Sequence, residues 1–311
     1  MDAAAPHLGS HAHPIRSSGD RLAWRRRLRG ALLLTAGIFT LEVAGGIYSR
    51  SLALLADAAH MFADIAALTL AYAAMSVAGR PATGRHSFGL YRAEILAAFV
   101  NAELLLLMSG WILFEAFGRF GQPVPVASGV MLAVASAGLL ANVAALRLLS
   151  RGRDESLNLR AAHLEIATDL VGSVAVVAAA LLIPRTGWIW LDPAVSIAVA
   201  VFILPRAFAL LKQSAHILLE GTPGEIDVRA LRARILEIDG VEALHDLHFW
   251  TLTSGLHSAS VHIRAAADGN RGDILQAVQR LLREEAGVDH ATIQVESGDE
   301  TACYDSTRSH A

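Results

Sequence analysis

The stretch LLADAAHMFAD, residues 54–64, decides the fold because it places ionisable side chains inside an otherwise apolar segment. Asp57, His60 and Asp64 are the only acidic residues and histidines in a run from Leu52 to Ala78, which has no Lys or Arg. A hydrocarbon core about 30 Å thick needs a helix of about 20 apolar residues, so this run predicts a membrane-spanning helix. A charged side chain at mid-helix costs roughly 2.5–3.5 kcal/mol, so these residues must face a cavity, a partner or an ion.

The composition of the whole chain also indicates a membrane protein. Of its 311 residues, 54% are apolar and 18% are charged, and the net charge is -3. An average soluble domain has about 25% charged residues. The balance excludes a disordered chain and a basic nucleic-acid-binding protein, so we expect no nucleic acid among its partners. The single cysteine, Cys303, cannot form a disulfide within the chain.

Five further apolar runs have similar length, and arginines or turn residues bound each of them. The six predicted transmembrane helices are Gly30–Tyr48, Leu52–Ala78, Glu94–Phe117, Val124–Leu149, Ala161–Ile183 and Trp188–Leu211. If the N-terminal tail lies inside, the outer loops contain only the arginines Arg50, Arg119 and Arg185. Short cytoplasmic loops retain Lys and Arg, so we expect both termini in the cytoplasm.

After Leu211 the pattern becomes that of a small soluble domain. It predicts helices over 226–238 and 273–285 and strands over 243–252, 258–264 and 291–296. The order αββαβ predicts a ferredoxin-like α+β domain in the cytoplasm. The expected parts are an N-terminal cytoplasmic tail that is disordered (1–27), a six-helix transmembrane domain (28–212), the ferredoxin-like domain (213–298) and a C-terminal tail (299–311).

The fifth predicted span, with AAHLEIATDLVGS at 161–173, repeats the spacing of ionisable residues. Glu165 and Asp169 are four residues apart, as are His60 and Asp64, so each pair lies on one helix face. If the two faces oppose each other, one imidazole and three carboxylates can form a tetrahedral site for a divalent metal. Buried structural pairing among these groups is the alternative.

Other polar residues of the spans have different expected roles. Asp57 shares the face of His60, nearer the outer end, and His163 lies on another side of its helix from Glu165. Polar contacts between helices are favoured over a direct role for Glu42, Asn101, Glu103 and Asn142.

From about Leu28 to Glu296 the sequence resembles the cation diffusion facilitators, a family of divalent-metal/proton antiporters. The resemblance rests on SLALLADAAHMFAD (51–64), HSFGLYRAEILAAFVNAELLLL (86–107), LNLRAAHLEIATDLVGSVAV (157–176), WLDPAVSIAVA (190–200), ILLEGTP (217–223), HDLHFWTLTSG (245–255) and TIQVE (292–296). It implies a homodimer in the lipid bilayer that exports divalent metal ions in exchange for protons. It implies a transporter, not an enzyme, with no resident cofactor.

By position, the family's intramembrane metal site falls on His60, Asp64 and Asp169, with Glu165 where many zinc members have histidine. That departure resembles the branch associated with cobalt, zinc and cadmium resistance. A carboxylate in place of an imidazole makes the site harder and more anionic. We expect zinc as the main cargo, with cadmium and cobalt close behind.

The resemblance also implies metal at a dimer interface of the carboxy-terminal domain. The matching positions are His245, His262 and Glu296, with His248 and His290 as further candidates. Strand alternation places His262 and Glu296 on outward faces, which suits a metal site and an ordinary solvated sheet face equally.

Two further histidine-containing segments are expected to hold no specific metal. The family's site in the loop between the second and third spans retains only His86, because Leu90 and Thr83 replace a histidine and an acid there. The tail residues His7, His11 and His13 are expected in a disordered segment that captures metal loosely at most.

Two other functions compete with export. A membrane-embedded metal hydrolase of the zincin type needs H-E-x-x-H, which the sequence lacks. A membrane-anchored metal sensor is the other alternative, but in such a protein the two pairs of ionisable residues in the spans would have no function. The short, histidine-free loop at 151–160 resembles bacterial members, so we expect the cell inner (plasma) membrane.

Overall fold

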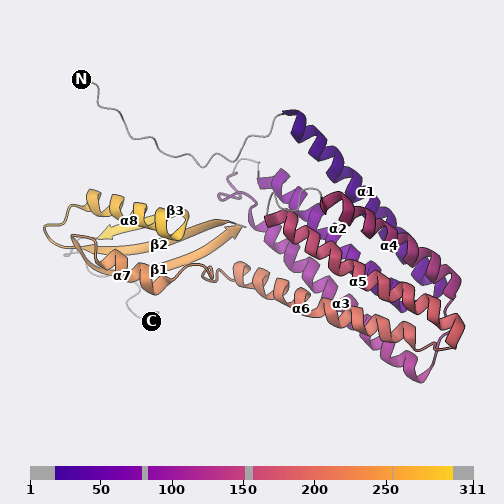
Figure 1. Cartoon of the computed structure of the whole chain (residues 1–311). Coiled ribbons are helices and arrows are strands. Elements are labelled where there is room, and N and C mark those ends of the chain that lie inside the picture. The colour runs from indigo at the N-terminus through magenta and orange to yellow at the C-terminus, as the bar shows by residue number, and fades with distance from the viewer. Residues whose placement is uncertain (1–17, 79–82, 151–156, 254, 297–311) are drawn as a thin grey trace. The chain divides into compact units, whose positions relative to one another are not determined.

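The computed structural model describes residues 18–78, 83–150, 157–253 and 255–296, and it contains six long helices followed by an αββαβ segment (Figure 1). The helices are α1 (Ser18–Ser49), α2 (Leu52–Ala78), α3 (Arg92–Gly121), α4 (Ser128–Ser150), α5 (Leu157–Thr186) and α6 (Leu191–Leu218). Each of the six predicted spans overlaps one of these helices.

Three helices in the described part of the chain are long and apolar enough to cross a membrane. They are α3, residues Asp169–Thr186 of α5, and α6. Two shorter apolar helices, Leu52–Ala63 and Ser128–Ala144, belong to α2 and α4. The prediction of six transmembrane helices therefore exceeds what the described residues show, and the described apolar stretches of α2 and α4 are shorter than a membrane span.

The chain divides into two compact units, one of Met1–Ile65 with Ser109–Val201 and one of Ala66–Met108 with Phe202–Ala311. In the first unit, α4 lies beside α1 and beside α5 (Figure 1). Small side chains permit this packing, as is usual between helices in membranes.

Gly45 illustrates how closely α1 approaches α4. A Cβ added at Gly45 would lie 2.7 Å from Cγ2 of Val134. Between α4 and α5, the buried cluster includes Ala135, Ala179 and Ala180. These small residues therefore allow α4 to pack closely against α1 and α5.

The second unit contains the small mixed sheet. Its elements are α7 (Val228–Leu236), β1 (Val241–Thr253), β2 (Leu256–Ala265), α8 (Arg271–Ala286) and β3 (Val288–Glu296). The strand order is β1-β2-β3, with β1 and β2 antiparallel and β2 and β3 parallel. The predicted order αββαβ is confirmed, and the predicted strands lie within the observed ones.

Alternating residues of β2 form the core of this domain. Ala259, Val261 and Ile263 are buried together with Ile235 of α7 and Val278 of α8. Since side chains alternate along a strand, the residues between them lie on the opposite face of the sheet. That opposite face carries the polar residues described below.

Candidate functional site

The structure brings together two of the four predicted intramembrane ligands. Nε2 of His60 on α2 lies 2.6 Å from Oδ1 of Asp169 on α5. Their side chains are 13% and 16% exposed, so the pair is not sealed inside a packed core. An imidazole and a carboxylate at this distance form a hydrogen bond or, when the imidazole is protonated, an ion pair. Both groups can also bind a divalent metal.

The other two predicted ligands are placed by their backbones alone. The backbone is helical through residues 60–64 and 165–169. Asp64 is therefore one turn from His60, and Glu165 is one turn from Asp169. The structure does not describe the side chains of Asp64 and Glu165, so the four-ligand site stays a prediction.

Asp57 makes a second contact between α2 and α5. The hydroxyl of Ser173 donates to Oδ2 of Asp57 at 3.4 Å, and Nδ2 of Asn142 on α4 donates to the Ser173 hydroxyl at 3.2 Å. Asp57 and Ser173 are buried. The predicted interhelical contact of Asn142 is confirmed. Sequence reasoning missed Ser173, although it stands four residues after Asp169 and so shares its helix face.

Glu42 of α1 is a further buried acid in the first unit. It is 1% exposed, and its Oε1 occupies the space next to Gly138 of α4, where an added Cβ would lie 2.5 Å away. Its Oε2 has no hydrogen-bond partner among the described residues. Glycine at 138 therefore makes room for this carboxyl group between two helices.

A second cluster of possible metal ligands lies on the small mixed sheet of the second unit. Nδ1 of His262 is 3.2 Å from Oε1 of Glu296, and Nε2 of His245 is 3.5 Å from Oε2. One ligand atom from each residue lies within 4.8 Å of the others. Glu296 is buried beside the two rings, although alternation alone predicted an outward, exposed position.

A β-bulge in β1 determines which histidines share this face. His245 pairs with His262 and His248 pairs with Ser260, so β1 advances one residue more than β2. Asp246 adopts a left-handed φ of 49° there, a conformation that Asp tolerates better than most residues. The bulge places His245 and His248 on the same face, whereas simple alternation would separate them.

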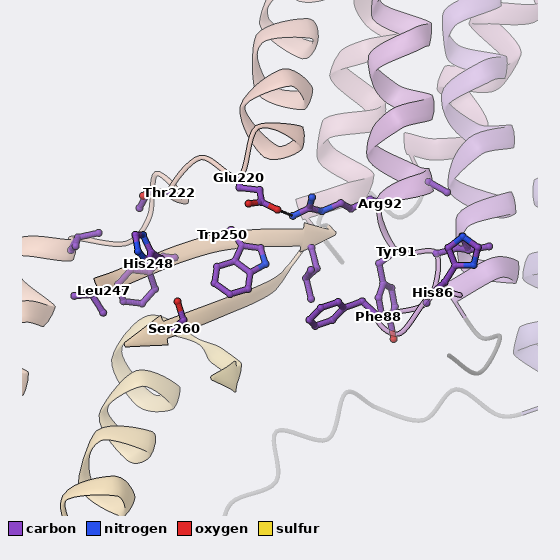
Figure 2. Close-up of a pocket in the computed structure, with 16 residues that line it drawn as sticks. His86, Phe88, Tyr91, Arg92, Glu220, Thr222, Leu247, His248, Trp250 and Ser260 are labelled. Atoms are coloured by element: carbon purple, nitrogen blue, oxygen red, sulfur yellow. Dashed lines mark hydrogen bonds and ion pairs between the residues drawn. The ribbon is translucent and has the colours of Figure 1, made fainter. Parts of the chain in front are cut away.

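The further histidine candidates lie outside this cluster. His290 packs edge-on against Phe88, with ring centroids 5.6 Å apart. His248 and His86 line a cavity of about 770 Å³ in the second unit, and Figure 2 shows them at different ends of it. The backbones of His86 and Thr83 hydrogen-bond to each other in a tight turn. His7, His11 and His13 lie outside the described residues.

Two contacts within the second unit join the start of α3 to later segments. Arg92 forms an ion pair with Glu220 at 2.9 Å, drawn in Figure 2, and the hydroxyl of Thr253 donates to Glu94. One joins the first turn of α3 to the segment that follows α6, and the other joins it to the end of β1. An exposed pair such as Arg92–Glu220 contributes about 0–1 kcal/mol, so it orients these segments more than it stabilises them.

Comparison with known proteins gives matches over nearly the whole chain. Residues 28–219 match the model of the cation efflux transmembrane domain, and residues 223–298 match that of the cation efflux protein cytoplasmic domain. The metal cation efflux system protein CzcD of Cupriavidus metallidurans is 42% identical over 92% of this chain and 89% of its own length.

Two other relatives and one solved structure are similar. The zinc transporter ZitB of Escherichia coli is 44% identical over 87% of each chain. The cadmium, cobalt and zinc/H(+)-K(+) antiporter of Bacillus subtilis is 39% identical over 86% of this chain and 87% of its own. The metal-bound C-terminal domain of the CzcD transporter covers 23% of this chain and 99% of its own, with 35% identity and a TM-score of 0.22.

The Ser173 bridge predicts a stability effect. Ser173→Ala removes a donor from the buried Asp57 and an acceptor from Asn142, which should lower the free energy of unfolding by about 1–3 kcal/mol. Thermal unfolding in a single detergent measures the change. Ser109→Ala is the matched control, because Ser109 is equally buried and its hydroxyl has no partner among the described residues. Equal melting temperatures for the two variants would contradict a stabilising role for the bridge.

Proposed function

Because the chain belongs to the cation efflux family, we propose that it exports divalent metal cations across the membrane in exchange for protons. It has the transmembrane and cytoplasmic domains of that family and is an integral membrane protein. The names of its relatives, which specify metal cation efflux, zinc transport and cadmium, cobalt and zinc antiport, support this function.

The His60–Asp169 contact is the observation that carries the proposal. Histidine and aspartate in apolar helices are costly unless they serve a partner or an ion. Here they meet across two helices and keep part of their surface accessible. A pathway for ions requires both features, whereas a purely structural pair would be sealed.

The register of α2 against α5 supports a four-ligand site. Asp57 meets Ser173 and His60 meets Asp169, so positions later in α2 face positions earlier in α5. If this register continues for one more turn of each helix, position 64 lies opposite position 165. We propose that His60, Asp64, Glu165 and Asp169 bind the transported ion, with Zn²⁺ as the main cargo and Cd²⁺ and Co²⁺ as others.

Protons and metal compete for the same lone pairs in this site. Metal binding needs ionised carboxylates and a neutral imidazole. When the site faces the cytoplasm, loss of protons allows the ion to bind. When it faces a more acidic exterior, protons bind to His60 and the carboxylates and release the ion. The proton that the close His60–Asp169 pair can hold is the one that the metal replaces.

The membrane potential determines what the protons must supply. Moving a divalent cation outward against 100 mV costs about 4.6 kcal/mol, and each returning proton offsets about 2.3 kcal/mol. Exchange for one proton moves net charge outward, and exchange for two is electroneutral.

The arginine distribution supports a topology of six spanning helices with both termini in the cytoplasm, in the inner (plasma) membrane. The protein acts as a homodimer in this proposal, joined in part through its cytoplasmic domain. The divalent ions and protons are its cargo, so it needs no resident cofactor.

We also propose that His245, His262 and Glu296 bind a divalent ion in the cytoplasmic domain. The three donors lie close enough to share one ion, and the buried carboxylate of Glu296 faces both imidazoles. Imidazole and carboxylate donors together suit Zn²⁺. A regulatory ion at this position would respond to the cytoplasmic metal concentration.

Transport assays test the intramembrane site. Asp64→Ala and Asp169→Ala should each abolish Zn²⁺ uptake into inside-out proteoliposomes with a pH gradient, because each removes a carboxylate ligand. Glu103→Ala, at an exposed acid of α3, should transport normally. Full transport in both ligand variants would refute the site, and metal binding without any transport by the wild type would favour the sensor.

Metal selectivity tests the role of Glu165. Glu165→His should narrow transport towards zinc, because an imidazole is a softer and less anionic donor than a carboxylate. The ratios of Zn²⁺ to Cd²⁺ and Co²⁺ uptake rates measure the change. Glu103→His provides the same substitution on another helix. Unchanged metal ratios in Glu165→His would contradict our interpretation of this position.

Metal titration tests the cytoplasmic cluster. Glu296→Gln should lower Zn²⁺ affinity by at least about tenfold in the detergent-solubilised protein, because the amide is a neutral and weaker ligand. Isothermal titration calorimetry measures the number of sites and their affinities. Glu285→Gln on α8 is the control, because Glu285 pairs with Arg234 away from the cluster. If Glu296→Gln binds Zn²⁺ with the same number of sites and the same affinities as the wild type, the assignment of a metal site to the cytoplasmic domain is refuted.

A further inference from the structure

Asp192, in the first turn of α6, is fully buried and contacts two other helices of the first unit. Its Oδ1 accepts from the Ser51 hydroxyl at 2.5 Å and from the Ala53 N–H at 3.2 Å. Its Oδ2 accepts from the Leu52 N–H at 2.9 Å. One carboxylate therefore holds the start of α2 against the start of α6.

These contacts complete the capping of α2. The first N–H groups of a helix have no intrahelical partner, and leaving them unpaired in a membrane is costly. Ser51, the residue just before α2, caps the helix with its own side chain, because its hydroxyl oxygen accepts from the Leu54 N–H at 3.2 Å. Asp192 satisfies the two N–H groups before it, and its negative charge lies at the positive end of the α2 dipole.

Arg119 extends the connection to α3. Its Nη1 lies 3.5 Å from Oδ2 of Asp192 and donates at 2.6 Å to the backbone carbonyl of Arg50. Arg50 has a left-handed φ of 57°, which directs the turn between α1 and α2. The beginning of α2 is thus joined to α6 directly and to α3 through Arg119.

The position of α2 along α6 determines where His60 lies. At 1.5 Å per residue, His60 is about 12 Å further along α2 than Leu52. The helix is continuous between them. A rotation or shift at the first turn therefore moves the imidazole relative to Asp169 of α5.

We propose that Asp192 is a positioning residue for metal transport, which holds α2 at the height and rotation that place His60 opposite Asp169. The inference rests on the proposed function. It differs from a capping role alone, because it requires the link to α6 as well as satisfied N–H groups on α2.

Three variants separate the link from the cap. Asp192→Ala removes the link to α6 and the part of the cap that Asp192 provides, the acceptor for the Leu52 and Ala53 N–H groups. Ser51→Asp combined with Asp192→Ala restores a carboxylate cap on α2 without the link. Ser51→Asp combined with Asp192→Asn restores both, because the new amide at position 192 can donate to the new carboxylate at position 51.

Transport kinetics and thermal stability are measured for each variant in proteoliposomes and in detergent. We expect Asp192→Ala to raise the apparent KM for Zn²⁺ by about tenfold and to lower the melting temperature. The Ser51→Asp, Asp192→Ala variant should recover stability with KM still raised. The Ser51→Asp, Asp192→Asn variant should recover both. Ser196→Ala is the control, because Ser196 is equally buried but donates to the backbone carbonyl of Asp192 within α6.

The proposal is overturned if Asp192→Ala has the wild-type KM, or if Ser51→Asp with Asp192→Ala recovers the wild-type KM. If Asp192→Ala does not fold, the two double variants still decide between the cap and the link. If the wild type moves no metal, the proposed function fails. The positioning role is then judged by Zn²⁺ affinity in detergent, measured for each variant in a Glu296→Gln background.

Discussion

An ionisable side chain within an apolar helix needs a partner, and this constraint connects the helices of the first unit. His60 contacts Asp169, Asp57 accepts from Ser173, and Asp192 accepts from the first turn of α2. Each contact joins α2 to another helix. Because hydrocarbon offers no water to satisfy these groups, their hydrogen bonds set the register of α2 against its neighbours.

Much of this arrangement could be predicted from the sequence. The lengths of the apolar runs located the helices, and the four-residue spacing of His60 and Asp64 put both residues on one helix face. Ser173 and Asp192 were missed for different reasons. A serine in a span resembles a small packing residue until its neighbour is known. An aspartate just before Pro193 resembles an ordinary helix start, whereas its carboxylate caps a different helix.

The cytoplasmic sheet shows a second limit of sequence patterns. Alternation predicted the core face of β2 correctly, because Val261 and Ile263 are buried. It could not predict the bulge at Asp246, which shifts the faces of the residues after it as far as Thr251, where the register of β1 shifts again. It also placed Glu296 in solvent, whereas the two histidine rings cover its carboxylate. The bulge depends on local φ values, and the burial of Glu296 depends on the packing of neighbouring strands. The pattern of a single strand contains neither.

The histidine and glutamate cluster takes one residue from each of the three strands. An ion held there would join β1, β2 and β3 to one another, in addition to their backbone hydrogen bonds. Because a ligand that binds only the folded state shifts the unfolding equilibrium, the stability of the domain would follow the supply of free metal. With little free metal the domain would unfold more readily, and with excess metal it would resist unfolding.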